Sequence, residues 1–244
     1  MELGSVSFAG KTGIITGAAQ GIGKAIAKGF VQMGGKAVIV DINPETATKT
    51  CEELGNAVYY TVDLGNPDEV VRVFQQIVEE QGRVEVLINN AGIVNTSDFD
   101  KLTLAEWNRV IAVDLTAVFL TSQVLFRHME QIGGGRIVNV ASIAGYLGTT
   151  AYAAAKAGVI SLTKSIAKAG SSKNIYCNSL CPAYTKTPLV SILTGEKEQK
   201  VLEAMSLHRA AAPEEVANGV LFLASDAASF IQGENLNCDG GMLM

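Results

Sequence analysis

The feature that most constrains this chain is a regular alternation of short apolar runs with longer amphipathic stretches. The short runs are rich in Val and Ile, and their apolar residues stand at consecutive positions, which is typical of strands covered on both faces of a parallel sheet. We expect strands at Thr12–Thr16, Lys36–Val40, Ala57–Tyr60, Val84–Ile88, Arg136–Val140, Ile175–Leu180 and Glu234–Asn237. Helical stretches lie between them, at Ile22–Met33, Glu45–Leu54, Pro67–Glu80, Leu104–Met129, Ala151–Ala169 and Pro213–Ala224. This order predicts one α/β domain over residues 1–244, a doubly wound parallel sheet of about seven strands with helices on both faces.

Composition and charge narrow the functional classes. The chain has 244 residues, of which 48% are hydrophobic and 18% charged, and this excludes a disordered protein. A net charge of −5 with scattered Lys and Arg speaks against nucleic-acid binding. We expect no secretory signal and no apolar run long enough to span a membrane, and hence a cytoplasmic protein. The four cysteines lack CxxC spacing and His128 and His208 lie far apart, so we expect reduced thiols and no metal site.

A glycine-rich turn, TGAAQGIG at residues 16–23, comes directly after the first predicted strand. Gly17 permits a tight turn, Gly21 lets the backbone approach a pyrophosphate, and Gly23 lets the next helix pack close to the sheet. The N–H groups at the start of that helix can hold a phosphate. Such a turn can also simply connect two elements, so by itself it is a weak indication of a phosphate site.

The end of the second predicted strand supports a dinucleotide site. Asp41 comes 24 residues after Gly17, where a carboxylate can accept hydrogen bonds from the ribose hydroxyls of adenosine. The same carboxylate would repel a 2′-phosphate, and neither Gln20 nor the residues after Asp41 supply a nearby cation. We therefore predict NAD as the cofactor in preference to NADP. The plain alternative is that Asp41 is only a strand-end turn residue.

Further motifs stand along the chain in a fixed order. They are Val62-Asp63-Leu64, Asn89-Asn90-Ala91-Gly92, Ser142, Tyr152-x-x-x-Lys156, Pro182 with Thr187, and Asp239-Gly240-Gly241. In this order they resemble the short-chain dehydrogenase/reductase family over nearly the whole chain. The resemblance implies a Rossmann-type fold and an oxidoreductase that interconverts secondary alcohols and ketones with NAD or NADP. The pattern is also similar to the β-ketoacyl-thioester reductases within that family.

The chemistry of this pattern centres on Tyr152 and Lys156, which stand four residues apart and share one face of a helix. A free tyrosine has a pKa of about 10 and is a poor base at neutral pH, but a neighbouring ammonium favours the phenolate. Tyr152 would then exchange a proton with the substrate while hydride moves to or from a nicotinamide. Ser142 would hydrogen-bond the substrate oxygen. The alternatives are a helix-surface pair for Tyr152 and Lys156 and a strand-end cap for Ser142.

The resemblance implies further cofactor contacts. Lys156 would also contact the nicotinamide ribose, Asp63 would lie near the adenine ring, and Thr187 would meet the nicotinamide carboxamide. Asp63, Asn90 and Thr187 could instead be turn or cap residues. The full set expected at the cofactor is Gly17, Gln20, Gly21, Ile22, Gly23, Asp41, Asp63, Leu64, Asn90, Ala91, Gly92, Tyr152, Lys156, Pro182 and Thr187.

The chain departs from the family pattern at three places. Asp114 stands where the family usually has Asn, whose main chain helps to hold a water that relays protons to the lysine. We expect Asp114 to act in the catalytic site with an altered pH dependence, because a buried carboxylate must be paired or protonated. Ser142 precedes Tyr152 by only ten residues, fewer than in the family, so the pocket wall between them is short. Ala183 replaces the usual glycine after Pro182, and alanine disfavours positive φ.

Residues 183–212 break the strand–helix rhythm, and we expect them to form a substrate lid. Ser142, Tyr152 and Tyr184 are the predicted substrate contacts. The other pocket candidates are mostly apolar and include no clear cationic anchor, which suits a medium-sized alcohol or ketone: Ile93, Val94, Tyr146, Leu147, Leu189, Val190, Ile192 and Leu193.

Two alternative functions stay open. One is an NADPH-dependent 3-oxoacyl-thioester reductase, and the other is a cofactor-binding relative with weak or lost turnover. Many members of the family form tetramers. Surplus apolar residues such as Phe119 and Leu162 on the two long helical stretches favour a homotetramer or homodimer here.

Overall fold

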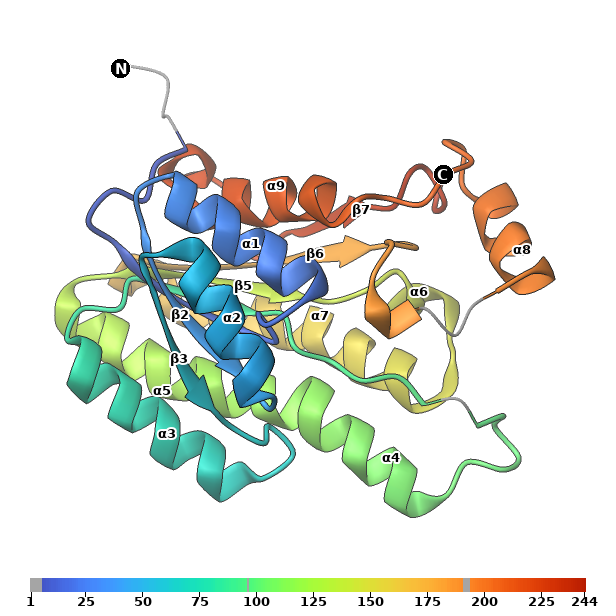
Figure 1. Ribbon diagram of the computed structural model, residues 1–244, viewed down its shortest axis with the longest axis horizontal. Coiled ribbons are helices and arrows are strands. Elements are labelled where there is room, and N and C mark those ends of the chain that lie inside the picture. The colour runs from blue at the N-terminus through green and yellow to red at the C-terminus, as the bar shows by residue number, and fades with distance from the viewer. Residues whose placement is uncertain (1–5, 96, 191–193) are drawn as a thin grey trace.

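The seven expected strands form and pair into one parallel sheet in the computed structural model, which describes residues 6–95, 97–190 and 194–244 (Figure 1). The strand order is β3-β2-β1-β4-β5-β6-β7. Because the winding reverses between β1 and β4, a crevice opens at the carboxyl ends of these strands, where α/β sheets bind their ligands. The strands are β1 Thr12–Thr16, β2 Lys36–Asp41, β3 Ala57–Thr61, β4 Val86–Asn89, β5 Gly135–Val140, β6 Ile175–Pro182 and β7 Asn235–Cys238.

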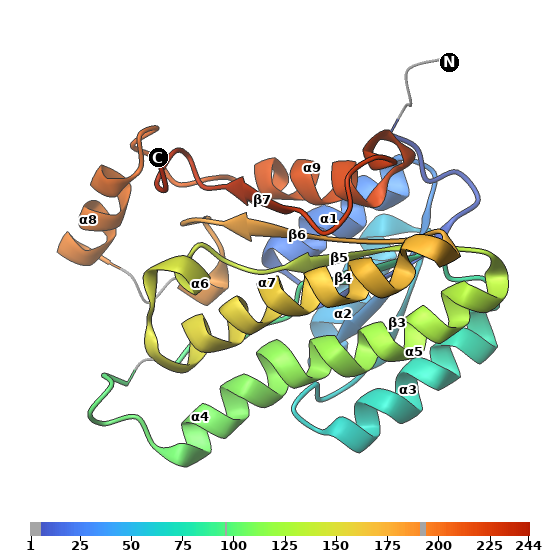
Figure 2. The same ribbon diagram turned by 180° about the vertical axis from the view of Figure 1, so that it is seen from behind.

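Helices cover both faces of the sheet (Figures 1 and 2). On one face, Phe30 of α1 and Val220 of α9 are fully buried in one cluster with Ile39 of β2. On the other face, Phe74 of α3 and Leu125 of α5 belong to a second buried cluster. The α-helices are α1 Gly21–Gln32, α2 Pro44–Leu54, α3 Pro67–Gln81, α4 Leu104–Ile111, α5 Ala117–Ile132, α6 Ala144–Leu147, α7 Thr150–Gly170, α8 Glu196–Ala204 and α9 Pro213–Ala224. Short 3₁₀ turns lie at Ser171–Lys173, Pro188–Val190 and Asp226–Ala228.

The starts of several helices are set locally by the sequence. Asn43 and Asn66 each precede a proline, and their side chains accept the backbone N–H groups of Thr46 and Glu69. Proline at the first helical position loses no hydrogen bond, and the Asn side chain satisfies an amide that would otherwise have no partner. These caps fix where α2 and α3 leave the carboxyl edge of the sheet.

The long helix predicted over Leu104–Met129 is interrupted. Residues Ala112–Thr116 form a π-helical turn between α4 and α5, and the buried Asp114 lies at its centre. Turns of this kind often mark functional sites. Within Leu104–Ile132 one window of 18 residues has a mean hydropathy of 1.6, so by length and composition alone this stretch would be long and apolar enough to cross a membrane. It is a partly buried core helix, and residues such as Leu125 pack on the sheet.

The described part of residues 183–212 contains two short helical elements, the turn Pro188–Val190 and α8. Ile192 and Leu193, predicted to line the pocket, lie outside the described residues. Cys51, Cys177, Cys181 and Cys238 are free thiols. His128 is buried and its Nε2 accepts the backbone N–H of Val84 at 3.1 Å. Among the described residues no group of His, Cys, Asp and Glu is arranged to hold a metal ion.

Candidate active site

A cavity of about 430 Å³ lies at the carboxyl ends of the strands. It collects residues from motifs that are far apart in the sequence. Of the predicted site residues, it is lined by Gly17, Gln20, Gly21, Ile22, Gly23, Asp41, Asp63, Leu64, Asn90, Ala91, Gly92, Ser142, Tyr152, Lys156, Pro182 and Thr187. Asp114 is fully buried beneath this surface, and Tyr184 lies next to the lining residues Ala183 and Thr185.

The glycine turn is packed tightly against the end of β4. A Cβ at Gly23 would overlap the carbonyl oxygen of Gly17, so the start of α1 can approach the turn only without a side chain there. Thr16 Oγ1 accepts the backbone N–H groups of Asn90 and Ala91, each at 3.0 Å. Asn90 Nδ2 in turn donates to the Thr16 carbonyl at 2.9 Å. Thr16, which our sequence reasoning did not assign, therefore joins two walls of the cavity. Because Ile15 pairs with Ile88, the ends of β1 and β4 lie side by side, and this neighbourhood is the signal that could have indicated the role of Thr16.

Asp41 is held at the edge of the cavity by two backbone amides. Its Oδ2 accepts the N–H of Ala19 at 3.0 Å, and its Oδ1 accepts the N–H of Asn43 at 3.1 Å. The carboxylate thus ties the glycine turn to the end of β2. The turn-residue alternative and the cofactor role are compatible, because each oxygen has a further lone pair that can accept a hydrogen bond.

Asp63 is paired with a residue that the sequence analysis did not single out. Arg109 of α4 donates from Nη2 to Asp63 Oδ1 at 2.9 Å and from Nη1 to Oδ2 at 3.2 Å. The backbone N–H of Gly65 also donates to Oδ1, at 2.8 Å. The Arg109 guanidinium, helped by this amide, holds the pKa of Asp63 below its usual range. Arg109 itself lines the cavity.

Lys156 and Asp114 form a buried ion pair behind the Tyr152 ring. Lys156 Nζ lies 3.3 Å from Asp114 Oδ2, and the two side chains are 4% and 0% exposed. The same ammonium donates to the Val140 carbonyl at 3.2 Å and lies 5.5 Å from the centre of the Tyr152 ring. Asp114 Oδ1 accepts the N–H of Ile93 at 2.9 Å. Asp114 therefore touches Lys156 through its side chain.

Burial and charge act in opposite directions on this pair. Burial raises the pKa of the Asp114 carboxyl, and the Lys156 ammonium and the Ile93 amide only partly oppose that effect. Burial lowers the pKa of Lys156, but the charges of Asp114 and Tyr152 outweigh it and leave that pKa above its ordinary value. Lys156 is therefore protonated at neutral pH and places a positive charge next to Tyr152.

The wall between Ser142 and Tyr152 is short, as predicted from the spacing. Ser142 Oγ accepts the N–H of Ala144 at 3.1 Å, so it caps the turn into α6 and still has its own proton to donate. Thr150 closes the wall with a φ of +51°, a conformation that β-branched residues rarely adopt. The Asn95 side chain holds it there, because Nδ2 donates to Thr150 Oγ1 at 2.8 Å.

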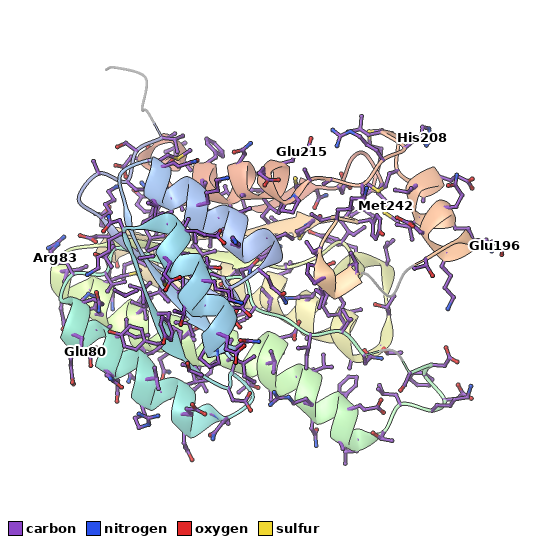
Figure 3. The ribbon with its side chains drawn as sticks, in the orientation of Figure 1. Glu80, Arg83, Glu196, His208, Glu215 and Met242 are labelled. Atoms are coloured by element: carbon purple, nitrogen blue, oxygen red, sulfur yellow. The ribbon has the colours of Figure 1, made fainter. Side chains whose placement is uncertain are left out.

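The segment after β6 covers the cavity in part. Ala183, Thr185, Pro188, Leu189 and Val190 line it together with Thr187. Tyr184, a predicted substrate contact, has another partner: it is 9% exposed and its hydroxyl donates to Glu198 of α8 at 2.9 Å. Ala183 is not among the residues with positive φ, so the exchange of glycine for alanine leaves ordinary backbone there. Figure 3 shows Glu196 of α8 at one end of the molecule and Arg83 at the opposite end.

Comparison with known proteins agrees with this geometry. A family model described as Enoyl-(Acyl carrier protein) reductase matches residues 17–243. The 3-oxoacyl-[acyl-carrier-protein] reductase FabG of Aquifex aeolicus is 36% identical over 245 residues, which cover 97% of this chain and 99% of that protein. The chain belongs to the short-chain dehydrogenase/reductase family. It is an oxidoreductase that acts on CH–OH groups with NAD or NADP.

Other relatives of this short-chain dehydrogenase/reductase differ in substrate. The cis-4-hydroxycyclohexanecarboxylate dehydrogenase of Sinomonas cyclohexanicum is 38% identical over 242 residues, covering 96% of this chain and 97% of that protein. A crystal structure from Beutenbergia cavernae, named as a candidate NAD(P)-dependent gluconate 5-dehydrogenase with NADP bound at low occupancy, has a TM-score of 0.94 and 33% identity. That alignment covers 98% of this chain and 99% of the other. The family and fold are therefore shown, and the relatives do not agree on one substrate.

Proposed function

We propose that this enzyme interconverts a secondary alcohol and a ketone with NAD(H), and that Tyr152 is the acid and base. The observation that carries the proposal is one shared cavity. Tyr152, Lys156 and Ser142 line the same space as the glycine turn and Asp41. A proton-transfer group, its cationic neighbour and a dinucleotide cradle thus meet in one place.

The residues fit a dinucleotide. The turn at residues 17–23 brings backbone and the start of α1 to the cavity without a side chain at Gly23, which suits a pyrophosphate. Asp41 would accept hydrogen bonds from the adenosine ribose of such a cofactor, and Asn90, Gly92 and Thr187 line the same cavity as Tyr152. When bound, the nicotinamide supplies or accepts the hydride.

Asp41 also supports NAD in preference to NADP. A 2′-phosphate on that ribose would meet the Asp41 carboxylate. Among the described lining residues only Arg109 and Lys156 carry positive charge. Arg109 is already bound to Asp63, and Lys156 lies against Asp114.

In the proposed mechanism the chain's own groups orient the substrate and move one proton. Ser142 donates its hydroxyl hydrogen to the substrate oxygen and holds it near Tyr152. During alcohol oxidation the Tyr152 oxygen accepts the hydroxyl proton, and during ketone reduction it returns a proton to the new alkoxide. The Lys156 ammonium places a positive charge 5.5 Å from the centre of the Tyr152 ring.

The substrate end of the cavity favours an uncharged substrate. Ile93, Ala183, Leu189 and Val190 line the cavity with Ser142 and Tyr152, and no side chain of these four can pair with a carboxylate. We therefore propose a neutral, moderately apolar alcohol or ketone. The second candidate is an NADPH-dependent 3-oxoacyl-thioester reductase, which the 36% identity to the Aquifex protein favours and the Asp41 carboxylate disfavours.

Three further proposals complete this function. Residues 183–212 act as a lid over the substrate, because six of the described residues in this range line the cavity: Ala183, Thr185, Thr187, Pro188, Leu189 and Val190. The enzyme is a homotetramer or homodimer, supported by Phe119, which is 45% exposed on α5. It acts in the cytoplasm, in keeping with its free thiols.

The decisive experiment compares the wild type with Tyr152→Phe on a panel of ketones and alcohols, with NAD(H) and NADP(H) tested separately. We expect turnover of neutral substrates with NAD(H), a loss of more than about 10³-fold in kcat for Tyr152→Phe, and unchanged NADH binding by fluorescence. Wild-type NADH binding without turnover of any substrate would favour the relative with lost activity. Turnover of 3-oxoacyl thioesters with NADPH alone would favour the second candidate.

A further inference from the structure

One residue that lines the cavity has no role in the function proposed above. Arg109 comes from the second half of α4, shortly before the π-helical turn that contains Asp114, and reaches Asp63 and Gly65 after β3. Its guanidinium is fixed by two hydrogen bonds to Asp63, at 2.9 and 3.2 Å. A bidentate grip of this kind orients the guanidinium plane as well as its charge.

The backbone beneath the guanidinium is shaped to receive it. A Cβ at Gly65 would overlap Arg109 Nη1, so the guanidinium rests directly on the main chain after β3. Asp63 links the two parts, because its Oδ1 accepts the Gly65 amide at 2.8 Å as well as Arg109. Three residues from two distant segments thus build one flat surface at the cavity edge, a guanidinium whose charge is paired with the Asp63 carboxylate.

This surface lies at the end of the cavity that would hold the base of a dinucleotide. The Asp41 carboxylate at the end of β2 marks the ribose position, and β3 is the next strand outward. The same end is lined by Ile42, which is 59% exposed although it is a large apolar side chain. An exposed aliphatic group and a flat cation are both good partners for an aromatic ring.

We propose that Arg109 is a cofactor-binding residue that forms a wall of the adenine pocket and binds the base through the face of its guanidinium. Asp63 then acts on the cofactor through Arg109, which it positions, in addition to any direct contact with the base. This inference rests on the proposed dinucleotide function and extends it to a residue on α4.

The test separates the two halves of the cofactor. NADH, AMP and reduced nicotinamide mononucleotide are titrated into wild type and Arg109→Ala, by fluorescence or calorimetry. We expect Arg109→Ala to weaken NADH and AMP by the same factor, roughly fivefold to tenfold, and to leave the mononucleotide unchanged. Arg109→Lys keeps the charge but lacks the planar fork, so it should lose most of the same affinity.

A matched control is Arg83→Ala. Arg83 also pairs with an acidic residue, Glu85 at 3.0 Å, but it lies at the other end of the molecule (Figure 3). We expect it to bind all three ligands like the wild type. Unchanged AMP affinity in both folded Arg109 variants, or an equal loss for AMP and the mononucleotide, would overturn the inference while wild-type binding and turnover keep the proposed function. Wild-type protein that binds no dinucleotide would instead end the proposed function itself.

Discussion

Two ion pairs lie at the cavity, Arg109–Asp63 and Lys156–Asp114, and they differ in how deeply their side chains are buried. Arg109 and Asp114 lie five positions apart in the sequence, and each pairs with a residue from another segment. The Arg109–Asp63 pair is short, 2.9 Å, and its side chains are 44% and 40% exposed. The Lys156–Asp114 pair is longer, 3.3 Å, and its side chains are 4% and 0% exposed.

Burial, more than the distance between the charged atoms, decides how much each of these ion pairs contributes to stability. Water screens the exposed pair, and such pairs contribute about 0–1 kcal/mol to stability even with good geometry. The buried pair has no water to replace a missing partner, so removing one charge leaves the other uncompensated at a cost of about 3–5 kcal/mol. We therefore expect loss of the shorter pair, Arg109–Asp63, to destabilise the fold less than loss of Lys156–Asp114.

The largest expected effect is that of Asp114→Ala. This variant leaves the Lys156 ammonium 4% exposed and without its carboxylate. We expect the free energy of unfolding to fall by about 3–5 kcal/mol in urea denaturation. Asp63→Ala is the matched control, and we expect its loss to stay below about 1 kcal/mol. Equal losses for the two variants would contradict the ranking by burial.

A milder change at the same position, Asp114→Asn, tests the pH dependence. The amide oxygen can still accept the Ile93 N–H, which the carboxylate now accepts at 2.9 Å, but the negative charge is gone. The charge of Asp114 helps to raise the pKa of Lys156 against the effect of burial, so without it that pKa falls. We expect kcat of Asp114→Asn to decline at alkaline pH at a lower pH than that of the wild type, because Lys156 loses its proton sooner. The measurement is the pH profile of kcat, and an unchanged profile would show that Asp114 does not tune the site.

The sequence predicted the fold and most of the cavity because both depend on strong local signals. The strands at 12–16 and 36–40 were recognisable as unbroken apolar runs, and a parallel sheet brings all their carboxyl ends to one edge. Residues placed directly after those ends, such as Asp41 and Asn90, therefore had to lie near one another. That topological argument needs no knowledge of side-chain packing.

The features that could not be predicted from the sequence depend on packing between segments. The π-helical turn at Ala112–Thr116 changes the helix geometry over only five residues, and the spacing of apolar residues in the sequence does not reveal it. The Arg109–Asp63 pair joins residues 46 positions apart, and it forms only because the fold brings the Arg109 side chain of α4 to the segment after β3. Tyr184 comes shortly after a strand end like its neighbours, yet it turns to Glu198 of α8.

His128 is a buried side chain that accepts a hydrogen bond in its neutral form, and we expect its contribution to stability to lie between those of the two ion pairs. His128 is 9% exposed and its Nε2 accepts the Val84 N–H, so the ring must be unprotonated at that atom. Burial lowers the pKa of His128 in the folded state. The folded protein thus binds protons less readily than the unfolded chain, so this contribution is complete above about pH 6.5 and is lost as the pH falls through the folded-state pKa.

The corresponding variant is His128→Gln, which keeps an acceptor but cannot titrate. We expect the wild type to lose stability relative to this variant between pH 7 and pH 5, by about 1 kcal/mol, the usual contribution of one hydrogen bond. The measurement is the free energy of unfolding in urea at several pH values. Parallel pH curves for the two proteins would mean that the protonated ring is accommodated as well as the neutral one.

The smallest expected effect is the stability change in Arg109→Ala, although its effect on cofactor binding is large. The exposed pair should contribute less than about 1 kcal/mol, and about 0.5 M NaCl should remove most of that difference. Arg109 lowers the pKa of Asp63, so the contribution is present above about pH 4 and is lost as the pH falls through the folded-state value. Arg209→Ala, which breaks a similarly exposed pair with Glu215, is the control and should show the same salt sensitivity. If Arg109→Ala lost more than about 2 kcal/mol of unfolding free energy and the loss persisted in salt, the Arg109–Asp63 pair would behave like the buried pair. Burial would then not explain the difference between the two ion pairs.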